Sequence, residues 1–339
     1  MSAMTPTFAP IPERADVTPE VFHAQIVPAY APVVLRGFAA DWPAVAAGLA
    51  GPGKTAAYLK ALDTGSPVQA FVGPPEIGGK FFYAPQGRAV NFTRKQTRLS
   101  AAIDEILATT DGASLYVGST PARQAAPGFE AANRNRLLPP AVEARLWVGG
   151  ETSIQTHYDL SDNIAVVVAG RRRFTLFPPD QTKNLYVGPL DFTPAGQPVS
   201  LVSLDAPDLD RHPKFVDALP HGMSAELEPG DAIYIPTLWW HHVRSSGPLN
   251  VLANYWWSDL AGKAGSPFEV LIHALMSLRH LPEPQRQAWR AIFDHYVFET
   301  GDDPGAHLPP EMKGVLGPLS PQLTHNVRAF LLHALGKGG

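Results

Sequence analysis

The sequence contains no cysteine. It therefore has no disulfide, no thiolate ligand for a metal and no cysteine nucleophile. Any metal that the chain binds must be held by histidine and carboxylate side chains. The lack of cysteine also fits a reducing compartment.

Long apolar runs and an excess of one charge are also missing. No stretch approaches the roughly 18 uninterrupted apolar residues of a membrane-spanning helix. The N-terminus lacks the basic patch and apolar run of a signal peptide, so we expect a cytoplasmic protein. The formal charge is −4 and the pI is about 6.3. This balance makes nucleic acid an improbable obligatory partner.

The hydrophobic content of 45% in 339 residues is enough for a sizeable core, and the pattern changes twice along the chain. Residues 1–145 mix short helices and strands and form a flanking α/β segment. Residues 146–258 carry short β runs separated by turns, with a long insert at 180–225. Among these runs we expect strands at 163–169 and 173–177, joined by a tight turn at Gly170. This spacing favours a mainly β fold, a double-stranded β-helix of the cupin or jelly-roll type. Residues 259–339 read as amphipathic helices, a helical extension.

The candidate metal ligands are two histidines and one carboxylate. His157 and Asp159 lie two residues apart, and residues so spaced in a strand project from the same face. His241 follows some eighty residues later, after the predicted strand at 232–235. Two histidines and one carboxylate form the facial triad of non-haem Fe(II) oxygenases, which leaves open positions on the metal.

Several ordered motifs accompany the triad. They occupy residues 32–37, 157–159, 170–180, 185–186, 229–236, 239–242 and 254–256. Together they resemble the cupin-like Jumonji C family of Fe(II)- and 2-oxoglutarate-dependent oxygenases. The branch with the greatest likeness contains the asparaginyl hydroxylase that acts on hypoxia-inducible factor.

The resemblance implies Fe(II) held by His157, Asp159 and His241, with 2-oxoglutarate as cosubstrate and O2 as oxidant. The adjacent His242 should point elsewhere, because successive residues of a strand cannot easily aim at the same metal. It implies that Arg172, in place of the family's lysine, pairs with the far carboxylate of 2-oxoglutarate, a role suited to a guanidinium. Tyr116 matches the family's tyrosine donor to the same carboxylate. Asn163 and Asn254 match its pocket asparagines.

Two further assignments concern the pocket wall. The family often has Thr or Ser where this chain has Ile154, and Thr156 is the nearest substitute, although it should face away from its neighbour His157. Tyr158, Trp256 and Trp239 are candidates for the substrate pocket. The substrate itself is an unknown protein or small molecule.

Alternative functions remain open. Hydroxylation of an N-methyl group would make the chain a demethylase of the same family. A metal-binding cupin that does not turn over 2-oxoglutarate, or a binding module without catalysis, is also compatible with the pattern. The C-terminal helices resemble, in position, the extension through which relatives dimerise, so we expect a homodimer.

Overall fold

The computed structural model describes residues 7–85, 88–194, 196–258, 265–298, 301 and 303–336. The chain divides into two compact units, residues 1–257 and 258–339. The predicted further boundary at residue 145 stays a prediction. Among the described residues, no helix is long and apolar enough to cross a bilayer.

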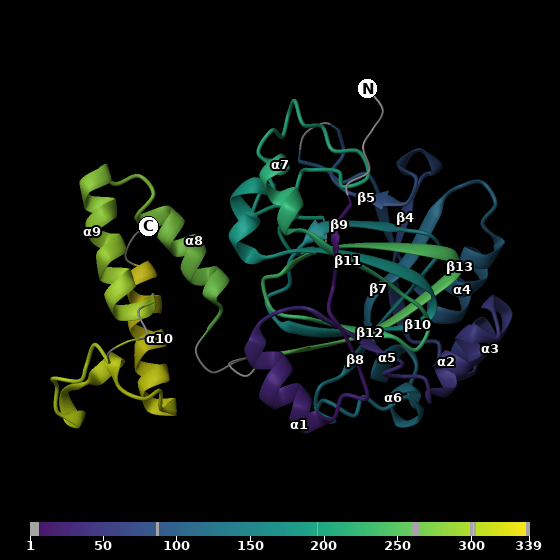
Figure 1. The fold of residues 1–339 in the computed structure, drawn as a ribbon, viewed down its shortest axis with the longest axis horizontal. Coiled ribbons are helices and arrows are strands. Elements are labelled where there is room, and N and C mark those ends of the chain that lie inside the picture. The colour runs from purple at the N-terminus through teal and green to yellow at the C-terminus, as the bar shows by residue number, and fades with distance from the viewer. Residues whose placement is uncertain are drawn as a thin grey trace. The chain divides into compact units, whose positions relative to one another are not determined.

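The first unit is mostly β, as predicted, and its strands form one hydrogen-bonded network (Figure 1). Along the main path the order is β2 (Glu13–Ala15), β3 (Val33–Arg36), β12 (Ala232–Ile235), β10 (Asp162–Phe177), β13 (Trp240–Trp257), β8 (Ala144–Gly149), β7 (Ser114–Pro121), β4 (Pro67–Gly73) and β6 (Thr93–Arg98). Beside this path, β11 (Met223–Leu227) pairs with β10 and with β1 (Ala9–Pro10), and β9 (Ser153–His157) pairs with β13 and with β5 (Lys80–Phe81).

The two longest strands, β10 and β13, pair with each other along most of their length. The first half of β10 pairs with β12, and its second half pairs with β11. The sequence predicted two strands here, at 163–169 and 173–177, joined by a turn at Gly170. This prediction is wrong, because the positive φ of Gly170 (+73°) and shifts of register produce a bend within one strand.

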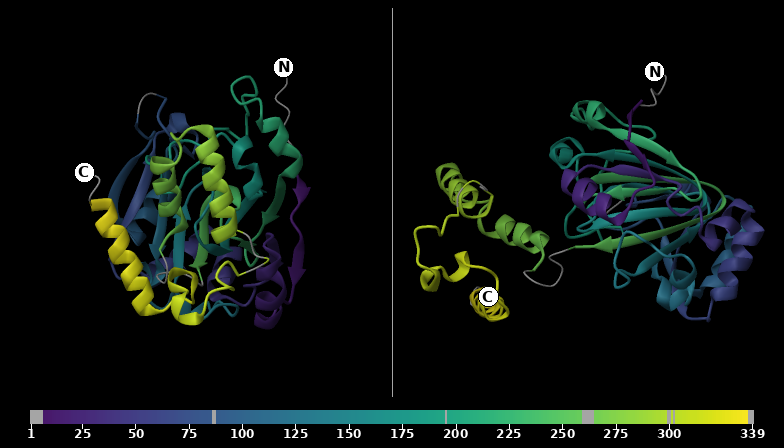
Figure 2. Two further views of the ribbon diagram at one scale, coloured as in Figure 1. Left: turned by 90° about the vertical axis from the view of Figure 1, so that its left-hand side faces the viewer. Right: turned by 60° about the horizontal axis from the view of Figure 1, so that its bottom comes forward.

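A cluster of buried apolar side chains, here called the apolar layer, covers one face of the central strands. Phe174 and Leu176 of β10 pack there with Leu227, Ile235 and Val243. The opposite face of the main sheet is covered by α2 (Pro43–Leu49), α3 (Pro52–Leu62) and α4 (Leu99–Ala108), which bury a second and larger core. Figure 2 shows α2 and α3 together at one side of the strands. The fold thus buries apolar side chains on both faces of the central strands.

The remaining elements of the first unit are short. They are α1 (Pro19–Val21), a π-helix (Phe22–Ile26), 3-10 turns (Val27–Ala29, Pro75–Ile77, Pro179–Asn184, Leu219–His221), α5 (Ala122–Ala125), α6 (Phe129–Ala132) and α7 (Phe215–Ala218). Thr18 caps α1 by accepting a hydrogen bond from the Val21 amide, as the Thr-Pro start predicts. The 180–225 insert has little regular structure but is tied to the core by paired residues, including His157 with Val199.

The second unit is helical, as predicted. It contains α8 (Pro267–Ser277), α9 (Glu283–Phe293) with a π-helical end (Asp294–Phe298), two 3-10 turns (Pro310–Met312, Gly314–Leu316) and α10 (Pro321–Gly336). None of the large hydrophobic side chains described after residue 257 is buried, and Phe330 and Leu332 are 69% and 73% exposed.

Candidate metal centre

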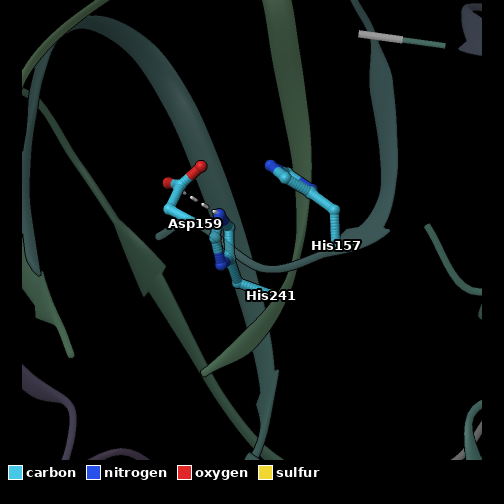
Figure 3. A group of neighbouring side chains, drawn as sticks. All are labelled: His157, Asp159 and His241. Atoms are coloured by element: carbon cyan, nitrogen blue, oxygen red, sulfur yellow. Dashed lines mark ion pairs between the residues drawn. The ribbon is translucent and has the colours of Figure 1, made fainter. Parts of the chain in front are cut away.

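Three side chains that could bind a metal converge where β9 ends and β13 begins. Figure 3 shows His157, Asp159 and His241 grouped together, with a dashed line where Asp159 and His241 approach each other. Their potential ligand atoms all lie within 4.8 Å of one another. His241 Nε2 lies 3.6 Å from Asp159 Oδ2, and the two imidazole centroids are 4.2 Å apart. This spacing suits a single bound metal ion.

The β ladder brings the histidines together. His157 is the last residue of β9, and His241 stands directly opposite it near the start of β13. Asp159 lies beyond the end of β9, in the segment that leads to β10. The sequence argument placed His157 and Asp159 on one strand. The structure instead brings the carboxylate to the histidines through the turn between two strands.

Both imidazoles are held in one tautomer. His157 Nδ1 donates to the Gln155 carbonyl (2.8 Å), and His241 Nδ1 donates to the Trp239 carbonyl (3.0 Å). A carbonyl only accepts, so Nδ1 carries the proton and Nε2 keeps its lone pair for a metal. Burial, together with the nearby His157, lowers the pKa of His241 to about 4, so that this imidazole is neutral at pH 7.

Hydrogen-bond donors fix the Asp159 carboxylate. Trp256 Nε1 donates to Asp159 Oδ2 (3.0 Å), and Asn163 Nδ2 approaches the same oxygen (3.4 Å). Asn254 Nδ2 in turn donates to Asn163 Oδ1 (3.4 Å), and Trp147 Nε1 donates to Asn254 Oδ1 (2.8 Å). The two asparagines therefore support the carboxylate, and such outer partners orient metal ligands.

A cavity of about 250 Å³ opens beside the triad. Besides His157 and Asp159, its lining comes from several elements: Phe81, Phe92, Tyr116, Ser119, Trp147, Ile154, Gln155, Pro194, Gln197, Val199 and Trp256. The aromatic rings make most of this wall apolar, and Pro194, Gln197 and Val199 come from the predicted insert. Trp147, Gln155, Phe81 and Phe92 escaped the sequence analysis, because the order of the strands is needed to bring them to the triad.

The predicted cosubstrate residues differ in their placement. Tyr116 lines the cavity, and burial raises the pKa of its phenol, which keeps the hydroxyl protonated as a donor. Asn163 and Asn254 are buried behind the cavity, in the network just described. Arg172 is not among the residues that line the cavity.

Arg172 is nevertheless an unusual side chain. It lies on β10 opposite Ser245 of β13, on the inward face with Phe174 and Leu176, and is 7% exposed. Its Nε has no hydrogen-bond partner, and no carboxylate among the described residues pairs with it. Burial lowers its pKa to about 10. A buried cation without an anion is costly, so this position suits a bound carboxylate.

Three other assigned residues lie outside the lining of this cavity. Thr156 is buried outside the cavity lining, while its neighbours Gln155 and His157 line it. Tyr158 is not among the residues that line the cavity and packs against Trp240, with ring centroids 4.8 Å apart. Trp239 packs in the apolar layer and donates to the Tyr30 carbonyl. Of the three predicted substrate-pocket residues, only Trp256 lines the cavity.

The adjacent histidine follows the predicted geometry. His242 Nε2 lies 3.0 Å from Ser153 Oγ, and His242 is not part of the group of possible ligands found among the described residues. Consecutive residues of a strand face opposite ways. His241 alone of this pair therefore faces the metal centre.

The fold and the site define a cupin-type protein with a candidate metal centre of two histidines and one carboxylate. Residues 19–263 match the family described as the cupin-like domain, and this chain belongs to that family. Similar proteins include tRNA wybutosine-synthesizing protein 5 of Mus musculus, 34% identical over 146 residues (39% of this chain, 43% of the relative). Lysine-specific demethylase JMJ31 of Arabidopsis thaliana is 36% identical over 109 residues (32% and 19%).

A third relative, Jumonji C domain-containing protein 5 of Drosophila melanogaster, is 32% identical over 124 residues (36% of this chain, 29% of the relative). The family match and these partial similarities agree on a cupin-like domain. The chain spans less than half the length of each of these three relatives.

Proposed function

We propose that this chain is an Fe(II)- and 2-oxoglutarate-dependent oxygenase that hydroxylates a C–H bond of a protein side chain or a small molecule. The observation that carries the proposal is the triad of His157, Asp159 and His241 at the wall of a cavity, with both Nδ1 atoms already committed to carbonyls. Nitrogen and carboxylate oxygen donors in this ratio suit Fe(II).

His157 and His241 would present Nε2 to the metal, and Asp159 would add a carboxylate oxygen. When bound, Fe(II) would supply the redox chemistry that couples O2 and the decarboxylation of 2-oxoglutarate, to succinate and CO2, with hydroxylation of the substrate. Three protein ligands would leave positions on the metal open for cosubstrate and O2.

The remaining residues bind, orient and exclude water. The Tyr116 hydroxyl would donate a hydrogen bond to the far carboxylate of 2-oxoglutarate, and Arg172 would pair with the same carboxylate through its positive charge. The aromatic side chains of Phe81, Phe92 and Trp147 keep most of the cavity wall apolar, which limits the access of water. No side chain is required to act as a general acid or base in this scheme.

The alternatives are separated by particular observations. A cupin that does not use 2-oxoglutarate would have no use for a buried, unpartnered Arg172. The resemblance of the sequence motifs to the asparaginyl hydroxylase branch, which the similar proteins named above do not include, favours hydroxylation. Demethylation remains the second candidate, because one similar protein is named as a lysine-specific demethylase.

The proposal is tested by anaerobic titration of the purified protein with Fe(II) and then 2-oxoglutarate. A metal-to-ligand charge-transfer band in the visible range is expected for the wild type and should be lost in His241→Ala. His242→Gln is the matched control, because it changes the neighbouring imidazole that faces Ser153, and it should keep the band. A wild type without the band, or a band that survives in His241→Ala, would contradict the proposal.

A further inference from the structure

A second cavity adjoins the metal-site cavity and shares part of its wall. It measures about 510 Å³ and is lined by residues of β4, β6, β7 and β8. Tyr116, Ser119 and Trp147 line both cavities, and Arg145 lines the second. The shared wall therefore lies between the second cavity and the triad.

Ser119 is the strained point of this wall. Its φ is +47°, in the left-handed region that non-glycine residues seldom adopt. The register of β7 against β8 slips between Val117 and Thr120, so Ser119 lies in a β-bulge. Strain of this kind persists only where neighbouring groups hold it.

Arg145 supplies that support from β8. Its Nε donates to Ser119 Oγ (2.7 Å) and its Nη2 donates to the Ser119 carbonyl (2.7 Å). No carboxylate among the described residues forms an ion pair with Arg145. The guanidinium therefore holds the Ser119 bulge through two hydrogen bonds, and no described carboxylate pairs with its charge.

The same guanidinium lies over the indole of Trp256, with 5.7 Å between Arg145 Cζ and the ring centroid. A cation over an indole is attracted to the face of the ring. Trp256 Nε1 donates to Asp159 Oδ2 (3.0 Å). Arg145 is therefore joined to a metal-binding carboxylate through a single side chain.

We propose that Arg145 is a positioning residue: it clamps the Ser119 bulge and holds the Trp256 indole so that its N–H orients Asp159 for the metal. This inference rests on the metal centre proposed above. Arg145 itself touches neither the metal ligands nor, in this scheme, the reacting atoms. Its effect on Asp159 passes through the orientation of Trp256.

The test is a titration of the purified full chain with Co(II), whose visible absorption reports its coordination. Removal of an outer partner of a ligand commonly costs 10- to 100-fold in metal affinity. We expect Trp256→Phe, which removes the N–H and keeps a ring, to raise the Co(II) Kd about 10-fold. Arg145→Ala should raise it about 3- to 10-fold and alter the Co(II) spectrum.

The decisive measurement is the double variant. If Arg145 acts through the Trp256 N–H, Arg145→Ala should change the Kd less than about twofold in a Trp256→Phe background. Arg136→Ala is the matched control, because Arg136 also donates to a carbonyl and lies over a ring, that of Phe38. It should leave Co(II) binding unchanged.

The inference is overturned if Arg145→Ala binds Co(II) within twofold of the wild type with the same spectrum, or if its effect adds fully to that of Trp256→Phe. Should Arg145→Ala fail to fold, Arg145→Lys, which keeps the charge but loses the two-pronged contact with Ser119, replaces it in the same cycle. A wild type that binds no Co(II) would instead refute the proposed metal centre.

Discussion

Replacing Arg172 by methionine should make the protein more stable and, at the same time, unable to bind 2-oxoglutarate. The side chain is buried, its Nε has no hydrogen-bond partner, and no carboxylate among the described residues neutralises it. Methionine has a similar length and adapts to irregular apolar space. The substitution therefore removes the charge while filling most of the volume.

The size of the effect follows from the pKa. Burial lowers the pKa of Arg172 well below its usual value, to about 10, and this shift corresponds to about 3 kcal/mol at 1.36 kcal/mol per pKa unit. The folded state disfavours the charged form, and at pH 7 both folded and unfolded chains carry that charge. The whole penalty therefore applies at pH 7 and disappears only as the pH rises from about 10 towards the usual pKa of an arginine side chain. Arg172→Met should raise the free energy of unfolding by up to about 3 kcal/mol.

The assay is urea unfolding of the metal-loaded protein under anaerobic conditions, with and without 2-oxoglutarate. A ligand that binds only the folded state stabilises it in proportion to the logarithm of its concentration above Kd. The wild type should gain stability with 2-oxoglutarate, whereas Arg172→Met should gain none. Arg171→Met is the control, since Arg171 is exposed and pairs with Glu228 at the surface (3.0 Å); it should change stability by less than about 0.5 kcal/mol.

The reasoning would be refuted if Arg172→Met were less stable than the wild type without 2-oxoglutarate and were still stabilised when it is added. That outcome would mean that the guanidinium is already satisfied in the free protein. It would also mean that another cation recognises the carboxylate.

Two further predictions concern the rest of the chain. We propose that the second unit associates with a second copy of the chain through its exposed apolar residues. Light scattering should give the mass of a dimer for the wild type and the mass of a single chain for the double variant Phe330→Glu, Leu332→Glu. A monomeric wild type would contradict the proposal. Gly170→Ala should lower the free energy of unfolding by about 2–3 kcal/mol, because the φ of Gly170 is +73° and a Cβ there would lie 2.1 Å from Asn250 Oδ1. The control is Gly53→Ala in α3, where a Cβ would meet nothing within 4 Å. In the same urea experiment this control should be neutral or stabilising.

The sequence predicted the β class and the possible ligands because both depend on local patterns. The spacing of His157 and Asp159, the strand before His241 and the alternation that buries Arg172 are all visible in the order of residues. The choice of His241 over His242 follows from the same alternation, and the structure gives them different surroundings.

The errors have a common physical origin in non-local pairing. Gly170 looks like a turn, but the long partnership of β10 with β13 continues past it, so the strand bends instead of reversing. Tyr158 and Trp239 lie close to the candidate ligands in the sequence, yet neither lines the cavity. Tyr158 packs against Trp240, and Trp239 belongs to the apolar layer.

The metal ligands and much of the cavity wall come from different segments of the chain, and this separation affects which substrates the cavity can accept. The ligands come from β9, the segment after it and β13, whereas Phe81 and Phe92 and the residues Pro194 and Gln197 come from two segments far apart in the sequence. Hydrogen bonds join these two segments: Tyr83 donates to the Phe192 carbonyl and Arg94 to the Pro194 carbonyl. Exchange of these segments can therefore alter the space over the metal without altering its ligands. For this reason a shared family fixes the expected chemistry more closely than it fixes the substrate.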